Sequence, residues 1–369
     1  MPFEPSITTL LWAGFVLGAA FGASARVGRF CLQRGLREAA AGGPAPALRA
    51  FALALAVALL ISQVLAWSGL VALDGAPVAR ARFSWVAVLV GGLLFGAGMA
   101  LARACGARSL VLLAGGNLRS LVTLLCLGLA AQATLTGVLV PVRQWLQGWG
   151  GVALAQATLP QQLRAWGLPD PVAAPGAAAL LALPLLVYAL RPARAGRGDS
   201  NAVPLLCAAI IGVLVATAWV VTAHLGDPFE PVPLTSLSYV GPVAEGLLFL
   251  QLAVGRDASL GPAIVAGTLA GAGVAALLTH TARWEGFESP AQLATSAIGG
   301  LLMGFGGVLA VGCTIGQGLA GLSALAWASV PACAGIVAGA WAVLCLQAHS
   351  FPSGSRSPRR APSCNDAIS

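Results

Sequence analysis

Two cysteines occupy matching positions in an internal duplication of the chain. The segment GGLLFGAGMALARAC ends at Cys105, and GGLLMGFGGVLAVGC, which ends at Cys313, lies 208 residues further on and is identical at nine of fifteen positions. A thiol is a weak hydrogen-bond donor and its sulfur a weak acceptor, so thiols can contact a ligand without holding it tightly. Because glycine-interrupted segments at corresponding places in two halves mark substrate sites in membrane proteins, these cysteines are the first candidates for a ligand site.

Polar residues follow both cysteines, between one apolar run and the next. We expect each apolar helix to stop part-way, turn at the cysteine and continue as a short helix, whose N–H groups and positive dipole end favour an anion. Thr314 and Gln317 are the candidate polar contacts in the second copy, and Asn117 and Arg119 in the first. Capping or packing is the alternative for these four, since Asn117 and Ser120 have the types and spacing of a helix start.

The elements that must position these residues are transmembrane helices. Hydrophobic residues make up 58% of the chain and charged residues 9%, whereas a soluble domain carries about 25% charged residues. Apolar runs long enough to cross about 30 Å of hydrocarbon recur throughout. They lie near residues 7–25, 49–72, 84–102, 121–141, 176–190, 203–223, 239–255, 260–279, 292–311 and 327–347. The sequence therefore predicts an all-α, polytopic membrane protein with nine or ten transmembrane helices and short re-entrant helices.

The first apolar run ends in small residues that resemble a signal-peptide cleavage site. A secretory signal begins with positive charge, but Glu4 is the only charged residue before this run. We therefore expect residues 7–25 to form a retained helix.

The excess positive charge comes from arginine alone. All twenty basic residues are Arg, and the formal net charge is +8. They form no long basic surface, which argues against nucleic-acid binding. Arg26, Arg29, Arg34 and Arg37 surround Cys31. This cluster either gathers anions at an entrance or anchors a loop at the membrane surface.

The other chemistry-bearing residues are scattered. The eight cysteines contain no CxxC pair and the three histidines are far apart, so we expect no metal site, no disulfide framework and no cofactor. Glu245 is the one acid well inside an apolar run. It is a candidate carrier of a coupling proton, although a structural pairing with an arginine is the favoured alternative. The chain lacks a GxxxxGK[ST] motif, which argues against direct ATP drive.

The chain divides near residue 200, where the sequence RPARAGRGDS separates two hydrophobic halves. We expect a first membrane half over residues 1–200, a second over 201–350 and a disordered basic tail over 351–369. The positive-inside tendency puts the linker and the tail in the cytoplasm.

Three cysteine-containing segments resemble the YeeE/YedE family of membrane proteins. They are RVGRFCLQRGLRE (26–38), GGLLFGAGMALARACGARSLVLLAGGNLRSLV (91–122) and GGLLMGFGGVLAVGCTIGQGLAGLSALAWAS (299–329). The string GCTIGQGLAGLS is the most specific part, and the similarity extends over most of the chain. One departure stands out: the family usually has glycines just before the second cysteine, where this chain has Arg103 and Ala104.

The resemblance implies a bacterial inner-membrane transporter that imports thiosulfate or a related sulfur-containing anion. It implies inverted internal repeats with pseudo-two-fold symmetry, and a central path along Cys31, Cys105 and Cys313. A cytoplasmic sulfur-carrier protein is a partner that the resemblance suggests.

Two other functional classes remain open. Another sulfur or selenium oxyanion would suit the same path. A membrane sulfurtransferase, with sulfur held covalently on Cys105 or Cys313, is the enzymatic alternative. A cysteine pair, a histidine nearby and a soluble domain are all missing from the sequence, which argues against an enzyme. An assembly scaffold would leave the duplicated polar turns unexplained, so we expect a transporter rather than an enzyme.

Overall fold

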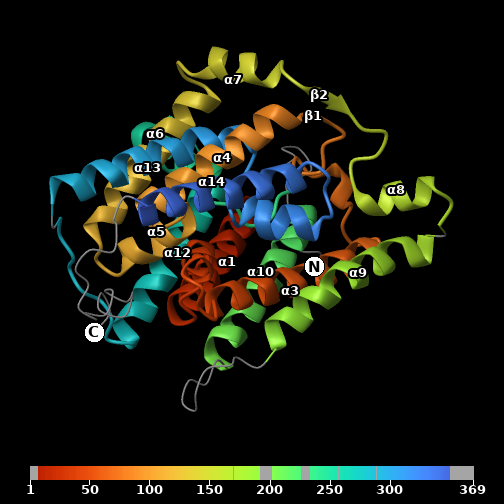
Figure 1. The fold of residues 1–369 in the computed structure, drawn as a ribbon, viewed down its shortest axis with the longest axis horizontal. Helices are drawn as coiled ribbons and strands as arrows, with labels where there is room; N and C mark the ends of the chain where they lie inside the picture. Colours follow the sequence, from red (N-terminus) through yellow and green to blue (C-terminus); the bar gives the residue numbers. More distant parts are fainter. Residues whose placement is uncertain are drawn as a thin grey trace.

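The computed structural model describes residues 7–168, 170–191, 202–225, 233–255, 257–287 and 289–349. Within these ranges helices form the fold, together with one two-stranded antiparallel sheet (Figure 1). The longer helices are α1 (Ile7–Val27), α3 (Pro46–Trp67), α4 (Trp85–Ala102), α6 (Leu118–Leu135), α9 (Asp170–Leu190), α10 (Ala202–His224), α12 (Leu260–Leu278), α13 (Pro290–Leu309) and α14 (Ser329–His349). The shorter elements are α2 (Leu32–Ala40), η1 (Leu73–Gly75), β1 (Arg82–Ser84), α5 (Gly106–Ala114), α7 (Val140–Gln147), β2 (Gly151–Ala153), α8 (Leu159–Ala165), α11 (Val240–Leu252) and the π-helical turn η2 (Gly316–Gly321).

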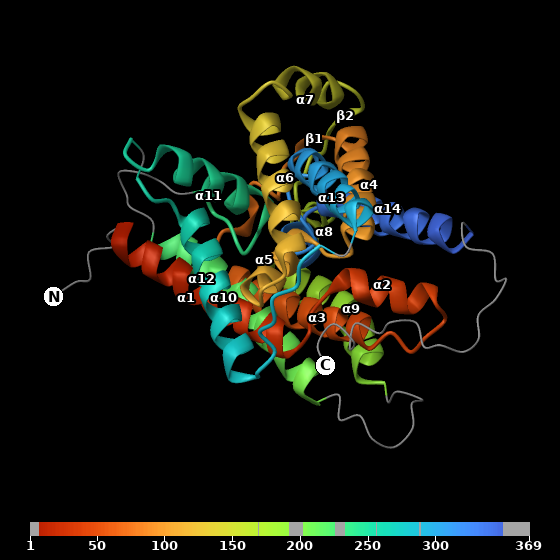
Figure 2. The ribbon, with the colours of Figure 1, turned by 90° about the vertical axis from the view of Figure 1, so that its left-hand side faces the viewer.

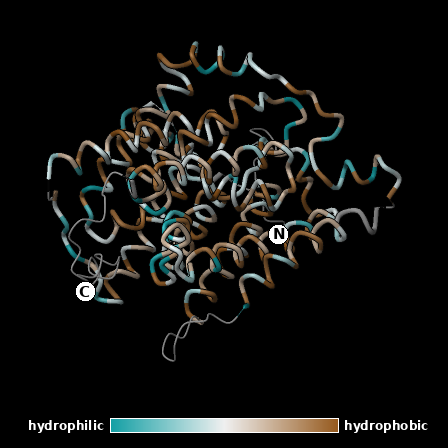
Figure 3. The backbone as a smooth tube through the Cα atoms, viewed as in Figure 1, coloured by the Kyte–Doolittle hydropathy of each residue, from teal (hydrophilic) through white to brown (hydrophobic). Residues whose placement is uncertain are grey.

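Eight helical segments in the described ranges are long and apolar enough to cross a membrane. They are Thr8–Ala40, Pro46–Trp67, Trp85–Ala114, Leu118–Leu135, Ala202–His224, Leu260–Leu278, Pro290–Leu309 and Ser329–Gln347. Apolar residues predominate along these helices (Figure 3). The runs expected at 176–190 and 239–255 form shorter apolar helices, Pro175–Leu190 and Val240–Leu252. Val240–Leu252 falls short of the roughly 20 residues that a spanning helix needs, whereas Pro175–Leu190 is the apolar part of the 21-residue helix α9. The described residues therefore contain eight candidate spans where nine or ten were expected.

The long helices pack in pairs from distant parts of the chain. α4 packs along α13 and α14, α13 packs along α6, and α1 packs along α12. Figure 2 shows α4, α6 and α13 as one group, above α1, α10 and α12. α4 and α13 run antiparallel, because Gly91 lies against Ala310 while Gly98 lies against Gly299.

Glycines permit these close approaches. A Cβ on Gly96 of α4 would collide with the carbonyl oxygen of Ile336 on α14, and a Cβ on Gly267 of α12 would collide with that of Phe15 on α1. Small residues let helix backbones approach closely in lipid, where van der Waals packing drives association. The glycines that the sequence shows in apolar runs therefore serve helix packing at these contacts.

Both copies of the duplication break at the same place. α4 ends at Arg103 (φ 60°) and α13 is followed by Val311 (φ 56°), and in each copy the cysteine stands two residues later. A short helical segment then begins, α5 in the first copy and η2 in the second. The expected helix that stops, turns at the cysteine and restarts is confirmed.

An additional segment follows α6. It contains α7, the strand β2, α8 and α9, of which α9 packs on α3. β1 and β2 pair antiparallel, with Phe83 opposite Val152. This two-stranded sheet lies beside α7 at one end of the molecule (Figure 1). The expected basic tail, 351–369, and most of the arginine-containing linker lie outside the described residues.

Candidate functional site

A small cavity brings Cys31 and Cys105 together from α1–α2 and α4–α5. Arg108 and Thr314 also line it. The other lining residues are apolar: Phe21, Ala25, Phe30, Leu32, Phe51, Ala107 and Ile315. A few polar groups in a mostly apolar cavity are typical of a small-molecule site, because they fix the orientation of a ligand that the walls desolvate.

The starts of short helices position the thiols. Cys31 immediately precedes α2, and Cys105 immediately precedes α5. The backbone N–H of Arg108 is directed at the Cys105 sulfur. In the second copy the backbone N–H of Gly316 donates to the sulfur of Cys313, at 3.4 Å. In both copies, then, an N–H three residues after the cysteine faces the thiol.

The three thiols form a connected group. Cys105 lies within electrostatic range of both Cys31 and Cys313. Tyr239 is in range of Cys313 and, less strongly, of Cys105. Cys313 and Tyr239 are fully buried. Cys31, Cys105, Cys313 and Tyr239 therefore lie near one another.

Tyr239 was not identified from the sequence, yet it matches Cys31 at the duplication spacing, since 31 plus 208 is 239. Tyr239 immediately precedes α11, as Cys31 precedes α2. Its hydroxyl lies 3.2 Å from Oγ1 of Thr268, and its ring packs on Phe21 with 5.0 Å between ring centres. The equal spacing was a signal in the sequence, but the two residues differ in type and so escaped a search for matching cysteines.

Thr314 places a buried hydroxyl at the cavity. It is 1% exposed and its side chain lies next to Cys105. Its Oγ1 has no nitrogen or oxygen partner among the described residues, and its hydroxyl hydrogen-bonds to the thiol of Cys105. Because sulfur is a weak acceptor, a ligand oxygen at this position would be a stronger partner for the hydroxyl.

Gln317 is buried one turn beyond Cys313, and both ends of its amide are occupied. Nε2 donates to the carbonyl oxygens of Ala310, at 2.7 Å, and Val311, at 3.0 Å. Oε1 accepts from the hydroxyl of Ser329, at 2.6 Å. The side chain therefore fastens the turn that carries Cys313 to the end of α13 and the start of α14.

Asn117 and Arg119 do not line the cavity. Asn117 caps α6, with Oδ1 accepting from the N–H of Ser120 at 3.0 Å, as the sequence predicts, and its amide also bonds Glu285. Arg119 donates to the hydroxyl of Ser296 on α13, at 2.5 Å. Both residues connect α6 to neighbouring segments.

Arg108 is the cation at the cavity, and sequence reasoning missed it. Its guanidinium donates to the carbonyl oxygen of Ala25, at 3.4 Å. No carboxylate in the described ranges pairs with it. In the sequence, its position in the first turn of the helix expected directly after Cys105 could have identified it. Arg103, the departure noted in the sequence, is exposed and does not line the cavity.

Arg26 lies close enough to Arg108 for the two charges to repel each other. It donates to the carbonyl oxygen of Thr281, at 2.6 Å, and to Oγ1 of the same residue. The carboxylate of Glu285 attracts Arg26 and so offsets part of its charge. Arg108, which pairs with no carboxylate in the described ranges, adds positive charge beside the thiols.

The other three arginines around Cys31 have different surroundings. Arg34 forms a salt bridge with Glu38 on α2, at 2.7 Å. Arg29 and Arg37 are exposed. Arg26 interacts with the cavity-lining Arg108.

Glu245 lies on α11 and faces the start of α12. It accepts a hydrogen bond from the hydroxyl of Ser259, at 3.2 Å, and lies against Gly261 in the first turn of α12. A carboxylate is stabilised by the positive end of a helix dipole. Glu245 does not line the cavity, so these contacts favour its structural role over proton coupling.

Comparison with known proteins identifies related chains. A family profile described as sulphur transport matches residues 27–342. The chain is similar to the thiosulfate transporter TsuA of Escherichia coli, with 24% identity over 351 residues that cover 90% of this chain and 93% of the relative. It is also similar to the thiosulfate transporter TsuA of Spirochaeta thermophila, with 26% identity over 341 residues that cover 90% of this chain and 97% of the relative.

Proposed function

The chain belongs to the sulphur transport family, the YeeE/YedE family that its motifs resemble, and we propose that it imports thiosulfate or a related sulfur-containing anion across the bacterial inner membrane. The observation that carries the proposal is the convergence of Cys31, Cys105 and Thr314 on one cavity, with Cys313 in electrostatic range. The names of the two similar transporters support thiosulfate as the substrate class.

Thiosulfate is a dianion with a hard sulfonate end and a soft terminal sulfur. A buried charge is costly unless it is paired, but full pairing by several arginines would hold the ion too tightly, since conduction needs weak, multi-site binding. Neutral thiols interact weakly with the soft sulfur. In this mechanism the terminal sulfur passes from Cys31 to Cys105 and then to Cys313, with no covalent bond formed.

The hard end needs hydrogen-bond donors along the same route. Thr314 offers a hydroxyl without a nitrogen or oxygen partner among the described residues, and Arg108 offers a guanidinium without a carboxylate partner. The backbone N–H groups that face Cys105 and Cys313 add two further donors. Arginine suits an oxyanion because its donors form a planar fork. Gln317, Asn117 and Arg119 act in this proposal by holding the turns in place.

The proposal includes two inverted repeats, over residues 1–200 and 201–350, related by a pseudo-two-fold axis. The packing of α4 on α14 has its counterpart in that of α13 on α6, and the packing of α1 on α12 in that of α10 on α3. Such a relation makes Cys105 and Cys313 equivalent positions and puts Tyr239 in the place of Cys31. Repeats of this kind bring a substrate site to their interface near the middle of the bilayer.

Growth tests the proposed function. A sulfur-auxotrophic bacterial host with thiosulfate as sole sulfur source should grow with the wild-type chain but fail with Cys105→Ser or Cys313→Ser at matched membrane expression. Serine keeps a hydroxyl dipole but lacks the soft sulfur, so a path that selects by polarity alone would keep working. Cys345→Ser, an exposed cysteine on α14, is the matched control and should grow.

Two outcomes would contradict the proposal. A well-expressed wild-type chain that supports no growth would exclude thiosulfate and turn the test to selenium and other sulfur anions. Growth of both serine variants would leave a transporter but exclude the thiol path.

A further inference from the structure

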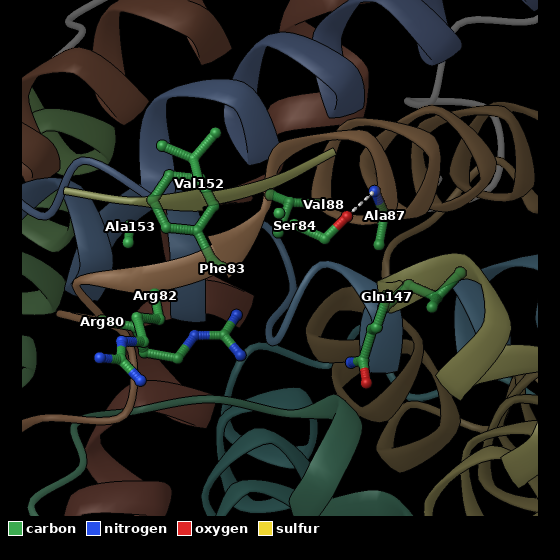
Figure 4. A pocket seen from close by; sticks show the side chains of 11 residues that line it. Arg80, Arg82, Phe83, Ser84, Ala87, Val88, Gln147, Val152 and Ala153 are labelled. Atoms are coloured by element: carbon green, nitrogen blue, oxygen red, sulfur yellow. Dashed lines mark hydrogen bonds between the residues drawn. The ribbon is translucent and has the colours of Figure 1, made fainter. Parts of the chain in front are cut away.

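A second cavity, of about 430 Å³, lies at the sheet formed by β1 and β2 (Figure 4). It is lined by Arg80, the two strands, the first turn of α4, the end of α7 and Leu309 at the end of α13. It shares no lining residue with the cavity that holds Cys31 and Cys105. Neither the proposed thiol path nor the family motifs account for it.

Two arginines and one amide face this cavity. Arg80 and Arg82 are two residues apart and both line the cavity. Figure 4 shows both arginine side chains on the same side of the two-stranded sheet, and Gln147 reaching the cavity from α7. No acidic residue lines the cavity. The polar lining therefore consists of donors suited to an anion.

These polar groups lack protein partners. Nε of Arg80 is buried without a hydrogen-bond partner, and no described residue forms an ion pair with Arg80 or Arg82. Burial lowers the pKa of Arg80 because the guanidinium loses water and gains no acceptor. Ser84, in contrast, is occupied, because it donates to the carbonyl oxygen of Trp149 and accepts from the N–H of Ala87. A desolvated cation without a partner is stabilised by an anion.

We infer that the Arg80–Arg82 pocket is a docking site for the hard, oxyanion end of the transported anion, occupied before the anion reaches the thiols. The inference rests on the proposed function for the identity of the anion. Bidentate guanidinium groups bind tetrahedral oxyanions well. The pocket contains no thiol, so it recognises the oxyanion and not the soft sulfur, and sulfate competes with thiosulfate there.

The position of the pocket fits a docking role. Leu309, which lines the pocket, stands four residues before Cys313 in the chain. Val88, which also lines the pocket, packs on Ala310 in a small apolar cluster. A pocket of one charge sign raises the local concentration of its counter-ion. An anion docked here lies next to the end of α13 that leads to the second thiol turn.

Binding without thiols tests the inference. The full chain with Cys31, Cys105 and Cys313 replaced by serine is purified in detergent, and equilibrium binding of radiolabelled thiosulfate is measured. We expect saturable binding that sulfate displaces, and a loss of affinity of about tenfold or more in Arg80→Gln/Arg82→Gln, since hydrogen bonds to charged groups are lost. Arg143→Gln on α7 is the matched control, because it removes a nearby charge that does not line the pocket.

The same double substitution in the chain with native thiols gives a second readout. It should raise the KM for thiosulfate uptake about tenfold and keep the maximal rate. Equal thiosulfate affinity with and without Arg80 and Arg82, or an unchanged KM, would overturn the inference and leave the proposed function intact. Binding in this pocket by a chain that takes up no thiosulfate would overturn the proposed function alone.

Discussion

At the scale of single residues, the polar groups around the thiols differ in how fully protein partners satisfy their hydrogen bonds. The hydroxyl of Thr314 and the guanidinium of Arg108 face the cavity without a carboxylate or amide partner. Gln317 and Asn117 have their amides taken by backbone and side-chain partners. Substitutions in the first pair should change substrate affinity, whereas substitutions in the second pair should change the stability of the turns.

Arg108→Gln tests the cation beside the thiols. Losing its hydrogen bonds to a bound oxyanion, each worth about 1.5–3 kcal/mol, should raise the KM for thiosulfate uptake tenfold or more. Arg108→Lys should restore part of the affinity, because lysine keeps the charge but lacks the planar fork. The measurement is initial uptake of radiolabelled thiosulfate into cells. Arg103→Gln, at an exposed site, is the control. An equal change in KM in that variant would show that Arg108 acts only through its charge and not through contact with the anion.

Tyr239→Phe tests whether the hydroxyl at the position that matches Cys31 in the duplication contributes to transport. Phenylalanine keeps the packing on Phe21 but removes the hydroxyl that bonds Thr268. We expect a lower maximal uptake rate with little change in thermal stability, since one neutral hydrogen bond contributes about 1 kcal/mol. Thr268→Val removes the same hydrogen bond and leaves the tyrosine hydroxyl, so it should transport normally. Equal loss in both variants would show that only the hydrogen bond matters.

At the scale of elements, close helix contacts depend on glycine rather than on side-chain interdigitation. α1 and α12 approach through Gly18 and Gly22 on one helix and Gly267 and Gly271 on the other. A Cβ at any of these positions would collide with backbone of the facing helix. Backbone cannot move aside as a flexible side chain can, so the contact tolerates little change.

Gly267→Ala should destabilise the protein by about 1–3 kcal/mol, because the added methyl forces α12 away from the carbonyl of Phe15. Gly246→Ala is the matched control on α11, where a Cβ meets nothing within 4 Å. There alanine should be neutral or stabilising by up to about 1 kcal/mol through helix propensity. The apparent melting temperature in detergent distinguishes the two. Equal melting temperatures would show that the helix pair adjusts freely.

At the scale of the whole molecule, the antiparallel course of α4 and α13 is the feature that an inverted repeat requires. The two helices carry the duplicated segments and pack side by side in opposite directions, with Gly91 against Ala310 and Gly98 against Gly299. In the proposed mechanism, two copies of one motif then approach the substrate from opposite directions. Arrangements of this kind expose one site alternately to the two sides of a membrane.

Cysteine labelling tests this orientation. Gly75, before α4, and Gly286, before α13, are exposed and a Cβ meets nothing within 4 Å at either. We expect a membrane-impermeant maleimide applied to intact cells to label only one of Gly75→Cys and Gly286→Cys above the wild-type background. After permeabilisation both should react. Labelling of both, or of neither, in intact cells would contradict the inverted arrangement.

The amino-acid sequence by itself determined the membrane class, the family and the broken helices at Cys105 and Cys313. Each depends on a local pattern: hydropathy over about 20 residues, a motif string, or glycines and polar residues within a few positions. The number of spans was less predictable, because α11 ends after thirteen residues although the apolar run continues. Where an apolar run stops being helical depends on the neighbours that it packs against.

Only the tertiary structure decided which side chains line the cavity. Arg108 lines it and Arg103 is exposed, although both are within three residues of Cys105. Thr314 lines it, whereas Gln317 holds the turn. The direction in which a residue points around a helix start, and the meeting of Tyr239 with thiols far away in the chain, follow from packing between distant segments, which no local sequence pattern records.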